Sequence, residues 1–220
     1  HQLSLSYDMN SGNTNIIDLK SKYRTDWVGE GFKTFVIYDV KNGRQEGETY
    51  VNKGFIHWRV IMPYDNPFFL EYFIQKEYND FIAIKDRSLV GAYLRTSLHD
   101  VVANLKAFNA RSYFGTGFMF ETTAYDERVD MQESKLVRWT NYFSLMWQPR
   151  EYMACGFTNY YQVNVSNWSD FRFLAEGSIR FIIEAQLSFK TTASLRYHSL
   201  PPTGIKKYDI EITNGIEFNF

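Results

Sequence analysis

The amino-acid sequence predicts an all-β fold: an up-and-down antiparallel transmembrane β-barrel of about twelve strands, with both termini on the periplasmic side. Three observations carry this prediction. Apolar and polar residues alternate along most of the chain, the alternating segments are long, and the last of them ends on an aromatic residue. We expect a single domain over residues 1–220, because barrels of this size commonly form one unit.

The C-terminal segment, residues 208–220, shows the alternation most clearly. One parity is apolar apart from Asn214 and carries Tyr208, Ile210, Ile212, Ile216, Phe218 and Phe220. The other parity is polar and carries Asp209, Glu211, Thr213, Gly215, Glu217 and Asn219. Successive side chains of a strand point to opposite faces, so this segment is expected to turn one face to lipid and the other to the lumen.

Segment length separates a membrane barrel from the alternative, a soluble β-sandwich rich in aromatic residues. Soluble strands most often have about 5–6 residues, whereas a tilted membrane strand needs about 9–11. The predicted strands are 2–10, 14–27, 31–42, 49–63, 68–79, 87–98, 111–124, 135–148, 151–164, 170–184, 186–199 and 206–220. Most of them are long enough to cross a bilayer, which favours the barrel.

The connections are expected to differ between the two ends of the barrel, with short periplasmic turns and longer, more polar outer loops. The predicted turns lie near 28–30, 64–67, 149–150 and 185, and the predicted loops at 43–48, 80–86, 125–134, 165–169 and 200–205. Two connections depart from this rule. The outer turn at 11–13 is tight, and the periplasmic connection at 99–110 is long and is expected to hold a helical turn that includes Val101, Val102, Leu105 and Phe108.

Composition excludes several classes of protein. A net charge of −1 gives no electrostatic footprint for nucleic acid. The sequence lacks a run of about 18 apolar residues, so no transmembrane helix is expected. The single cysteine, Cys155, cannot form an internal disulfide. The chain begins at His1 without a charged and apolar leader, and we interpret it as a mature outer-membrane chain whose signal peptide has been removed.

Aromatic residues make up 18% of the chain, and amphipathic rings settle at the headgroup level of a membrane. Trp139 and Trp147 share one face, and their spacing corresponds to roughly 20 Å along a tilted strand, which suits two girdles around an apolar band. The candidate girdle residues are Trp27, Trp139, Trp147, Phe218 and Phe220. The alternative is that Trp139 and Trp147 are ordinary core residues.

Charged residues on the opposite parity are expected to line the lumen. The principal candidates are Lys20, Lys22, Arg24, Arg138, Arg172, Glu176, Arg180, Arg196, Asp209, Glu211 and Glu217. The same parity carries Asp18, Asp26, Lys33, Asp39, Arg59, Glu71, Glu77, Arg95, Glu121 and Lys190. Both signs occur in similar numbers, which favours ion pairs that fill the interior, whereas a selective pore usually shows an excess of one sign. Phe35, Phe69, Phe73 and Tyr93 share this parity and would narrow the lumen further.

Three asparagines, Asn141, Asn159 and Asn214, fall on the predicted lipid-facing parity. A polar side chain in lipid is costly unless it has a partner. Either the local register of these strands differs from the prediction, or this side of the barrel contacts another protein.

Catalytic and metal-binding motifs are weak. The four histidines, His1, His57, His99 and His198, have no spacing typical of a metal site, and no cofactor is expected. His198 with Ser199 or Ser166 is the Ser–His combination nearest the predicted outer rim, but the parity of His198 points it into the lumen and away from lipid. We therefore predict no enzymatic activity.

One predicted outer loop is acidic. It carries Asp126, Glu127, Asp130 and Glu133. A solvated acidic loop is the simplest interpretation, and weak binding of the divalent cations that bridge lipopolysaccharide is the alternative.

Several short motifs occur in the order found in one known family. They are 6–15 (SYDMNSGNTN), 52–54 (NKG), Arg59 followed by Tyr64 and Asp65, 87–92 (RSLVGA), 170–172 (DFR) and 200–202 (LPP). Together they resemble a family of outer-membrane β-barrels of unknown function that includes the salt-induced outer-membrane proteins. The family's glycine-rich strand is replaced here by Tyr93, Leu94 and Arg95. The resemblance implies a barrel in the outer membrane and no settled activity.

Three functional hypotheses follow, in order of preference. They are a structural or accessory barrel within a larger outer-membrane complex, a narrow small-solute channel, and a rim or lipid-facing hydrolase. The expected partners are outer-membrane lipid and lipopolysaccharide, other outer-membrane proteins, and the barrel-assembly machinery, which reads C-terminal aromatic residues such as Phe220. Nucleic acid is not expected to bind.

Overall fold

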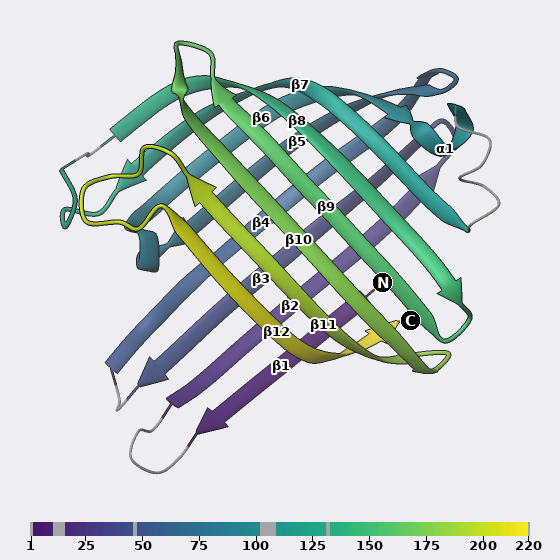
Figure 1. Cartoon of the computed structure of the whole chain (residues 1–220), viewed down its shortest axis with the longest axis horizontal. Helices are drawn as coiled ribbons and strands as arrows, with labels where there is room; N and C mark the ends of the chain where they lie inside the picture. The colour runs from purple at the N-terminus through teal and green to yellow at the C-terminus, as the bar shows by residue number, and fades with distance from the viewer. Residues whose placement is uncertain (1, 11–15, 46–47, 102–108, 131–132, 220) are drawn as a thin grey trace.

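A computed structural model of the chain describes residues 2–10, 16–45, 48–101, 109–130 and 133–219. These residues form twelve antiparallel strands that close into one barrel, each paired with its neighbours in sequence (Figure 1). The predicted fold class is therefore confirmed. The strands are β1 (Gln2–Asn10), β2 (Ile16–Gly29), β3 (Phe32–Gln45), β4 (Glu48–Asp65), β5 (Phe68–Asn79), β6 (Ile84–Ser97), β7 (Ala110–Tyr125), β8 (Glu133–Arg150), β9 (Met153–Asn164), β10 (Asn167–Glu184), β11 (Leu187–His198) and β12 (Tyr208–Asn219).

The C-terminal strand closes the barrel against the N-terminal strand. β12 pairs with β1 from Gln2↔Asn219 to Leu5↔Ile216, and with β11 along most of its length. The alternation of residues 208–220 thus places one parity inside and the other outside. Phe220 lies outside the described residues.

One end of the barrel, which we call the turn end, has tight connections at 30–31, 66–67, 151–152 and 185–186, and the paired strands β1 and β12 begin and finish there. At the opposite end, which we call the loop end, the longer described connections are 80–83, containing η1 (Asp80–Ile82), and 199–207. Connection 98–109 belongs to the turn end and begins with α1 (Leu98–Val101). Of the residues predicted for a helical turn, Val101 is the last residue of this helix, while Val102, Leu105 and Phe108 lie outside the described residues.

Two predicted outer loops are wrong, because strand pairing continues through them. β3 runs to Gln45 and β4 starts at Glu48, so most of 43–48 is strand, with a register shift at Gly43 and Arg44. β10 starts at Asn167, directly after a two-residue turn, and a register shift between Asn167 and Phe171 absorbs the polar residues that looked like a loop. A bulge lets polar residues remain within a ladder, and single-sequence parity does not detect it.

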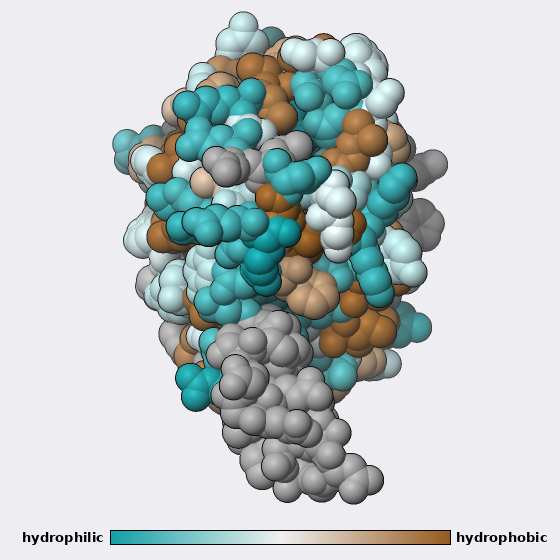
Figure 2. Space-filling view, turned by 90° about the vertical axis from the view of Figure 1, so that its left-hand side faces the viewer, coloured by the Kyte–Doolittle hydropathy of each residue, from teal (hydrophilic) through white to brown (hydrophobic). Residues whose placement is uncertain are grey.

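The distribution of side chains is the reverse of that in a soluble protein. Outward-facing Ile210 and Ile212 are 67% and 68% exposed, whereas the charged Glu71 and Glu121 are fully buried. An apolar exterior around a polar interior is typical of a transmembrane barrel. The face at the loop end carries mostly hydrophilic side chains with hydrophobic ones between them (Figure 2). No helix in the described part of the chain is long and apolar enough to cross a membrane.

Candidate functional site

The inward-facing side chains meet one another across the barrel. Lys53 of β4 reaches Glu211 of β12 at 2.7 Å, and Tyr142 of β8 donates to Glu71 of β5 at 2.8 Å. These strands are not neighbours in the sheet, so the contacts must cross the interior. The lumen is therefore the candidate functional site.

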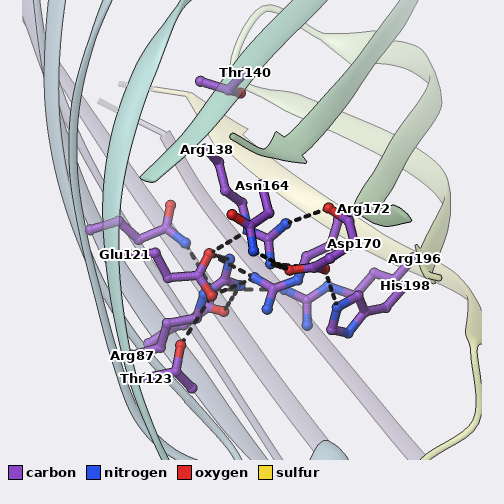
Figure 3. Close-up of polar contacts among 12 residues, drawn as sticks. Arg87, Glu121, Thr123, Arg138, Thr140, Asn164, Asp170, Arg172, Arg196 and His198 are labelled. Atoms are coloured by element: carbon purple, nitrogen blue, oxygen red, sulfur yellow. Dashed lines mark hydrogen bonds and ion pairs between the residues drawn. The ribbon is translucent and has the colours of Figure 1, made fainter. Parts of the chain in front are cut away.

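Glu121 of β7 is the centre of the most deeply buried cluster (Figure 3). Its carboxylate lies 3.0 Å from Arg87 Nη2, 2.9 Å from Arg138 Nε and 2.8 Å from Arg172 Nη1. Removing a charge from water costs several kcal/mol, and only well-placed opposite charges offset that cost. Three guanidinium groups around one carboxylate meet this requirement and tie β6, β8 and β10 to β7.

The cluster extends toward the loop end through Asp170 of β10. Arg138 Nη2 lies 3.0 Å from this carboxylate, and His198 Nε2 lies 3.1 Å from it (Figure 3). Asn164 Nδ2 donates to the same group at 3.1 Å. Asp170 thus couples the buried cluster to the rim.

Toward the turn end, a second buried cluster forms around Glu71 of β5. Glu71 accepts hydrogen bonds from Arg95 Nη1 at 2.6 Å and Arg59 Nη1 at 3.3 Å. The Arg59 guanidinium in turn lies 5.5–5.9 Å from the ring centres of Phe35, Phe73, Tyr93 and Tyr142, a cation–π distance. Large side chains therefore fill the lumen along the wall formed by β4–β8, which we call the packed wall.

The opposite wall, formed by β10–β12, carries small inward side chains at mid-height. They are Ser178, Thr192, Ser194, Thr213 and Gly215, which share the inward parity of Arg180, Lys190 and Glu217. Glu176 shares it too and is solvent-exposed. An inward side chain that is exposed shows that solvent reaches the lumen here, so we call this the open wall.

The cations beside the open wall are partly exposed and outnumber the two carboxylates that they contact, of which Glu211 is partly exposed and Glu217 is buried. Glu211 is approached by Lys53 at 2.7 Å, Lys41 at 3.3 Å and Lys20 at 3.8 Å near the loop end. Near the turn end, Glu217 is held between two further cations, Arg180 at 2.8 Å and Lys190 at 3.1 Å.

The structure brings most of the predicted lumen charges together. Besides those already placed, Lys22 lies 3.8 Å from Asp39, Arg24 binds Asp26 at 2.6 Å, and Arg196 lies 3.7 Å from Glu77. Glu176 and Asp209 form no ion pair within the described residues.

Four important groups were missed: Arg87, Asp170, Lys41 and Lys53. All four have the parity of lumen residues in their predicted strands. Arg87 and Asp170 are the first residues of their predicted strands. If the true strand began one residue later, they would belong to a loop, and the alternation would not assign them to either face.

The predicted girdle residues that the structure describes lie on the outer surface at two levels. Trp27, Trp147 and Phe218 are exposed close to the turn end. Trp139 lies nearer the loop end, where its Nε1 donates to Thr116 Oγ1 at 3.0 Å and its ring packs on Trp168. Their role at the membrane interface stays a prediction.

Of the three outward asparagines, Asn214 has a partner on the next strand. Thr191 Oγ1 lies 2.9 Å from Asn214 Oδ1, so a cross-strand hydrogen bond satisfies this polar group. Asn141 pairs in register with Thr116 and Tyr161, and Asn159 with Phe143 and Ala175.

The proposed Ser–His pair is not assembled at the rim. His198 contacts Asp170, while the Ser199 hydroxyl donates to the Ser169 carbonyl at 2.6 Å. Ser166 contacts Asn164 through its backbone N–H.

The acidic loop is held by protein groups. Arg128 lies 2.9 Å from Asp126, and Thr203 donates to Asp130 at 2.6 Å, which lowers the pKa of each carboxyl below its ordinary value. The described residues contain no group of three or more His, Cys, Asp or Glu that could hold a metal ion.

A closed twelve-stranded barrel with a charged interior and an apolar exterior defines the class of porin-like outer-membrane β-barrels. Residues 3–220 match the family described as Protein of unknown function, DUF481, and the chain belongs to this family. The family predicted from the short motifs is thereby confirmed. No characterised protein sequence matches the chain.

Solved structures of porins share the fold over the whole chain. The NanC porin in a rhombohedral crystal form has a TM-score of 0.62 at 6% identity, with 100% of both chains covered. The KdgM porin in complex with disordered oligogalacturonate has a TM-score of 0.56 at 8% identity, covering 100% of this chain and 99% of that one. A bacterial polysaccharide outer membrane secretin follows at 0.54 and 8% identity, covering 100% and 97%. At such identities the likeness concerns the fold.

Proposed function

We propose that this barrel is a narrow channel of the bacterial outer membrane for small hydrophilic solutes, with a preference for anions. The observation that carries the proposal is the one-sided filling of the lumen. Buried clusters occupy the packed wall, while small hydroxyl side chains and the exposed Glu176 leave the open wall accessible to solvent.

The cations beside this passage support the preference for anions. Glu211 faces three lysines and Glu217 faces two basic side chains, so each of these two carboxylates is outnumbered. Arg and Lys groups at a constriction favour anions. The sequence-based expectation of a balanced interior fits the packed wall and not the open wall.

The partial exposure of the cations among these groups also supports a passage. Lys20, Lys53 and Arg180 have side-chain exposures of 23%, 32% and 33%, so water reaches them inside the barrel. The Lys53–Glu211 pair spans the lumen near the loop end and makes it narrow. This geometry favours small solutes over polymers.

The second candidate is a structural or accessory barrel within a larger outer-membrane complex. The outward Asn141 and Asn159 favour it, because a partner protein could satisfy polar groups that lipid cannot. Lipid, lipopolysaccharide, the barrel-assembly machinery and other outer-membrane proteins stay proposed partners. We propose no catalytic activity.

Purified protein in planar bilayers separates the two candidates. The channel predicts discrete conductance steps and, in a salt gradient, a reversal potential displaced toward anion permeability. Silence at every voltage in correctly inserted protein would contradict the channel, and elution of the gently extracted protein as a lone barrel would contradict the complex.

A further inference from the structure

The β11–β12 loop, residues 199–207, crosses the mouth of the barrel at the loop end. Its Ile205 packs against a hydrophobic cluster of Ala83, Ile84, Tyr125 and Val129. These residues lie at the loop ends of β6 and β7 and in the adjoining connections, several strands away from β11 and β12 around the barrel. Figure 1 draws this loop in yellow beside the β7–β8 connection.

Hydrogen bonds fasten the loop to that side. Thr203 donates to Asp130 through its N–H at 3.2 Å and its hydroxyl at 2.6 Å. The loop therefore covers a part of the lumen instead of extending away from it.

A recess of about 60 Å³ lies beneath this loop. It is large enough for a small group of non-hydrogen atoms, since one water needs only roughly 10–15 Å³ by the same measure. One side is apolar, with Tyr125, Pro202 and Ile205 among its lining residues. The other side is basic and includes Arg87, Arg172, Arg196, His198, Lys206 and Lys207.

Positive charge is in excess around the recess. Asp209 is its acidic lining residue, and three further carboxylates, Glu77, Glu121 and Asp170, pair with its basic groups from behind. Those four acids face six cations, which are Arg138 and the five Arg and Lys residues of the lining. Lys206 and Lys207, which make up the surplus, are exposed at the mouth of the recess, and a surplus of positive charge at the mouth of a cleft attracts an anion.

Two basic side chains have donor capacity left over. Arg87 is 5% exposed, and its Nε has no hydrogen-bond partner among the described residues. Arg196 meets Glu77 at 3.7 Å, which is longer than a hydrogen bond (Figure 3 shows Arg196 at the edge of the cluster). Buried donors in proteins nearly always find an acceptor, so the buried Nε of Arg87 points to a ligand, and the partly exposed Arg196 has donors within reach of the same recess.

We propose that this recess binds a single oxyanionic group, phosphate or carboxylate, free or carried by a small solute. Arg196 and Lys207 contact the anion, Arg87 supplies the charge behind it, and the body of the solute lies along Tyr125 and Pro202. The site goes beyond conduction, because binding does not require that the lumen conduct.

Isothermal titration in detergent tests the site with inorganic phosphate and, separately, glucuronate as probes. The R196Q/K207Q variant is expected to weaken binding about tenfold or more, because two charge-assisted contacts are worth about 1.4 kcal/mol or more together. The matched control is K33Q/R150Q, which removes two exposed cations near the turn end for which the described residues show no ion pair, and it is expected to leave binding unchanged. Resistance of each variant to unfolding in cold SDS shows that the barrel is folded.

Tighter binding of phosphate or of glucuronate supports the site and identifies the solute class. No binding of either probe to the wild-type barrel, or equal weakening in both double variants, overturns the site. Conductance measured on the same protein preparations distinguishes failure of the channel from failure of the site. A barrel that binds phosphate but does not conduct would contradict the proposed channel and leave the binding site supported.

Discussion

The packed wall and the open wall of the lumen carry the same types of charged residue but differ in how deeply these residues are buried. Along β4–β8, charges such as Glu121 and Arg138 are almost fully buried, and the three buried carboxylates, Glu71, Glu77 and Glu121, each contact at least one guanidinium. Along β10–β12 and the neighbouring β2–β4 positions near the loop end, charges such as Lys53 and Arg180 remain partly hydrated. The comparison teaches that burial, more than charge, separates the groups that fill this barrel from the cations that water can reach.

The largest expected effect comes from breaking the packed wall at Glu121. E121Q leaves three guanidinium groups without their shared carboxylate, and removing one partner of a buried ion pair costs about 3–5 kcal/mol. Thermal unfolding in detergent should therefore occur at a clearly lower temperature. The matched variant E176Q alters an exposed carboxylate without a described ion pair, and an equal loss of stability there would contradict the division into two walls.

Conductance should depend on side-chain size at the open wall. S194W places a large ring among small hydroxyl side chains and is expected to reduce single-channel conductance several-fold, roughly in proportion to the lost cross-section. Y93F in the packed wall removes a hydroxyl that contacts Thr140 and should leave conductance nearly unchanged. Equal conductance in S194W and the wild type would place the passage elsewhere.

Ion selectivity should respond more moderately, because several charges contribute to it. E211Q removes the carboxylate that faces three lysines and is expected to raise the anion preference, while K53E is expected to lower it. Reversal potentials in a salt gradient measure both. A shift of the same sign in the two variants would argue against a charge effect.

The smallest expected effect concerns the loop that crosses the mouth. Because Thr203 donates to Asp130, the pKa of this carboxyl lies below its ordinary value, and the contact is fully present above the unfolded pKa. Stability of the contact is lost as pH falls through the lowered pKa, so the Thr203 amide should exchange faster in acid after correction for intrinsic rates. D130N should show faster exchange already at neutral pH, and unchanged protection in D130N would refute the contact.

Much of the fold could be predicted from the sequence because the alternation of apolar and polar residues indicates three things at once. It marks where the strands lie, which side chains face the lumen, and that the strands close into a barrel. The parity of residues 208–220 indicated both the outward Ile212 and the inward Glu211 correctly. Parity cannot indicate which inward groups meet, since the contact of Glu121 with Arg172 depends on the shape of the barrel cross-section.

The recess beneath the β11–β12 loop was beyond prediction for a related reason. Ile205 lies in a proline- and glycine-containing segment without periodicity, and its packing partners come from residues 83–129. Arg87, which supplies charge to that recess, stood at a predicted strand boundary. Long-range contacts and boundary residues are where single-sequence reasoning is weakest.

Thiol accessibility tests the one-sided filling of the lumen most directly. The C155S substitution removes the native thiol, and S194C and T140C then each introduce one thiol at an inward position. Ser194 lies on the open wall, whereas Thr140 is fully buried on β8 of the packed wall. A small water-soluble thiol reagent should modify S194C at least tenfold faster than T140C in folded barrels, since reaction requires an accessible thiolate. Equal rates, or faster modification of T140C, would contradict the division into a packed and an open wall.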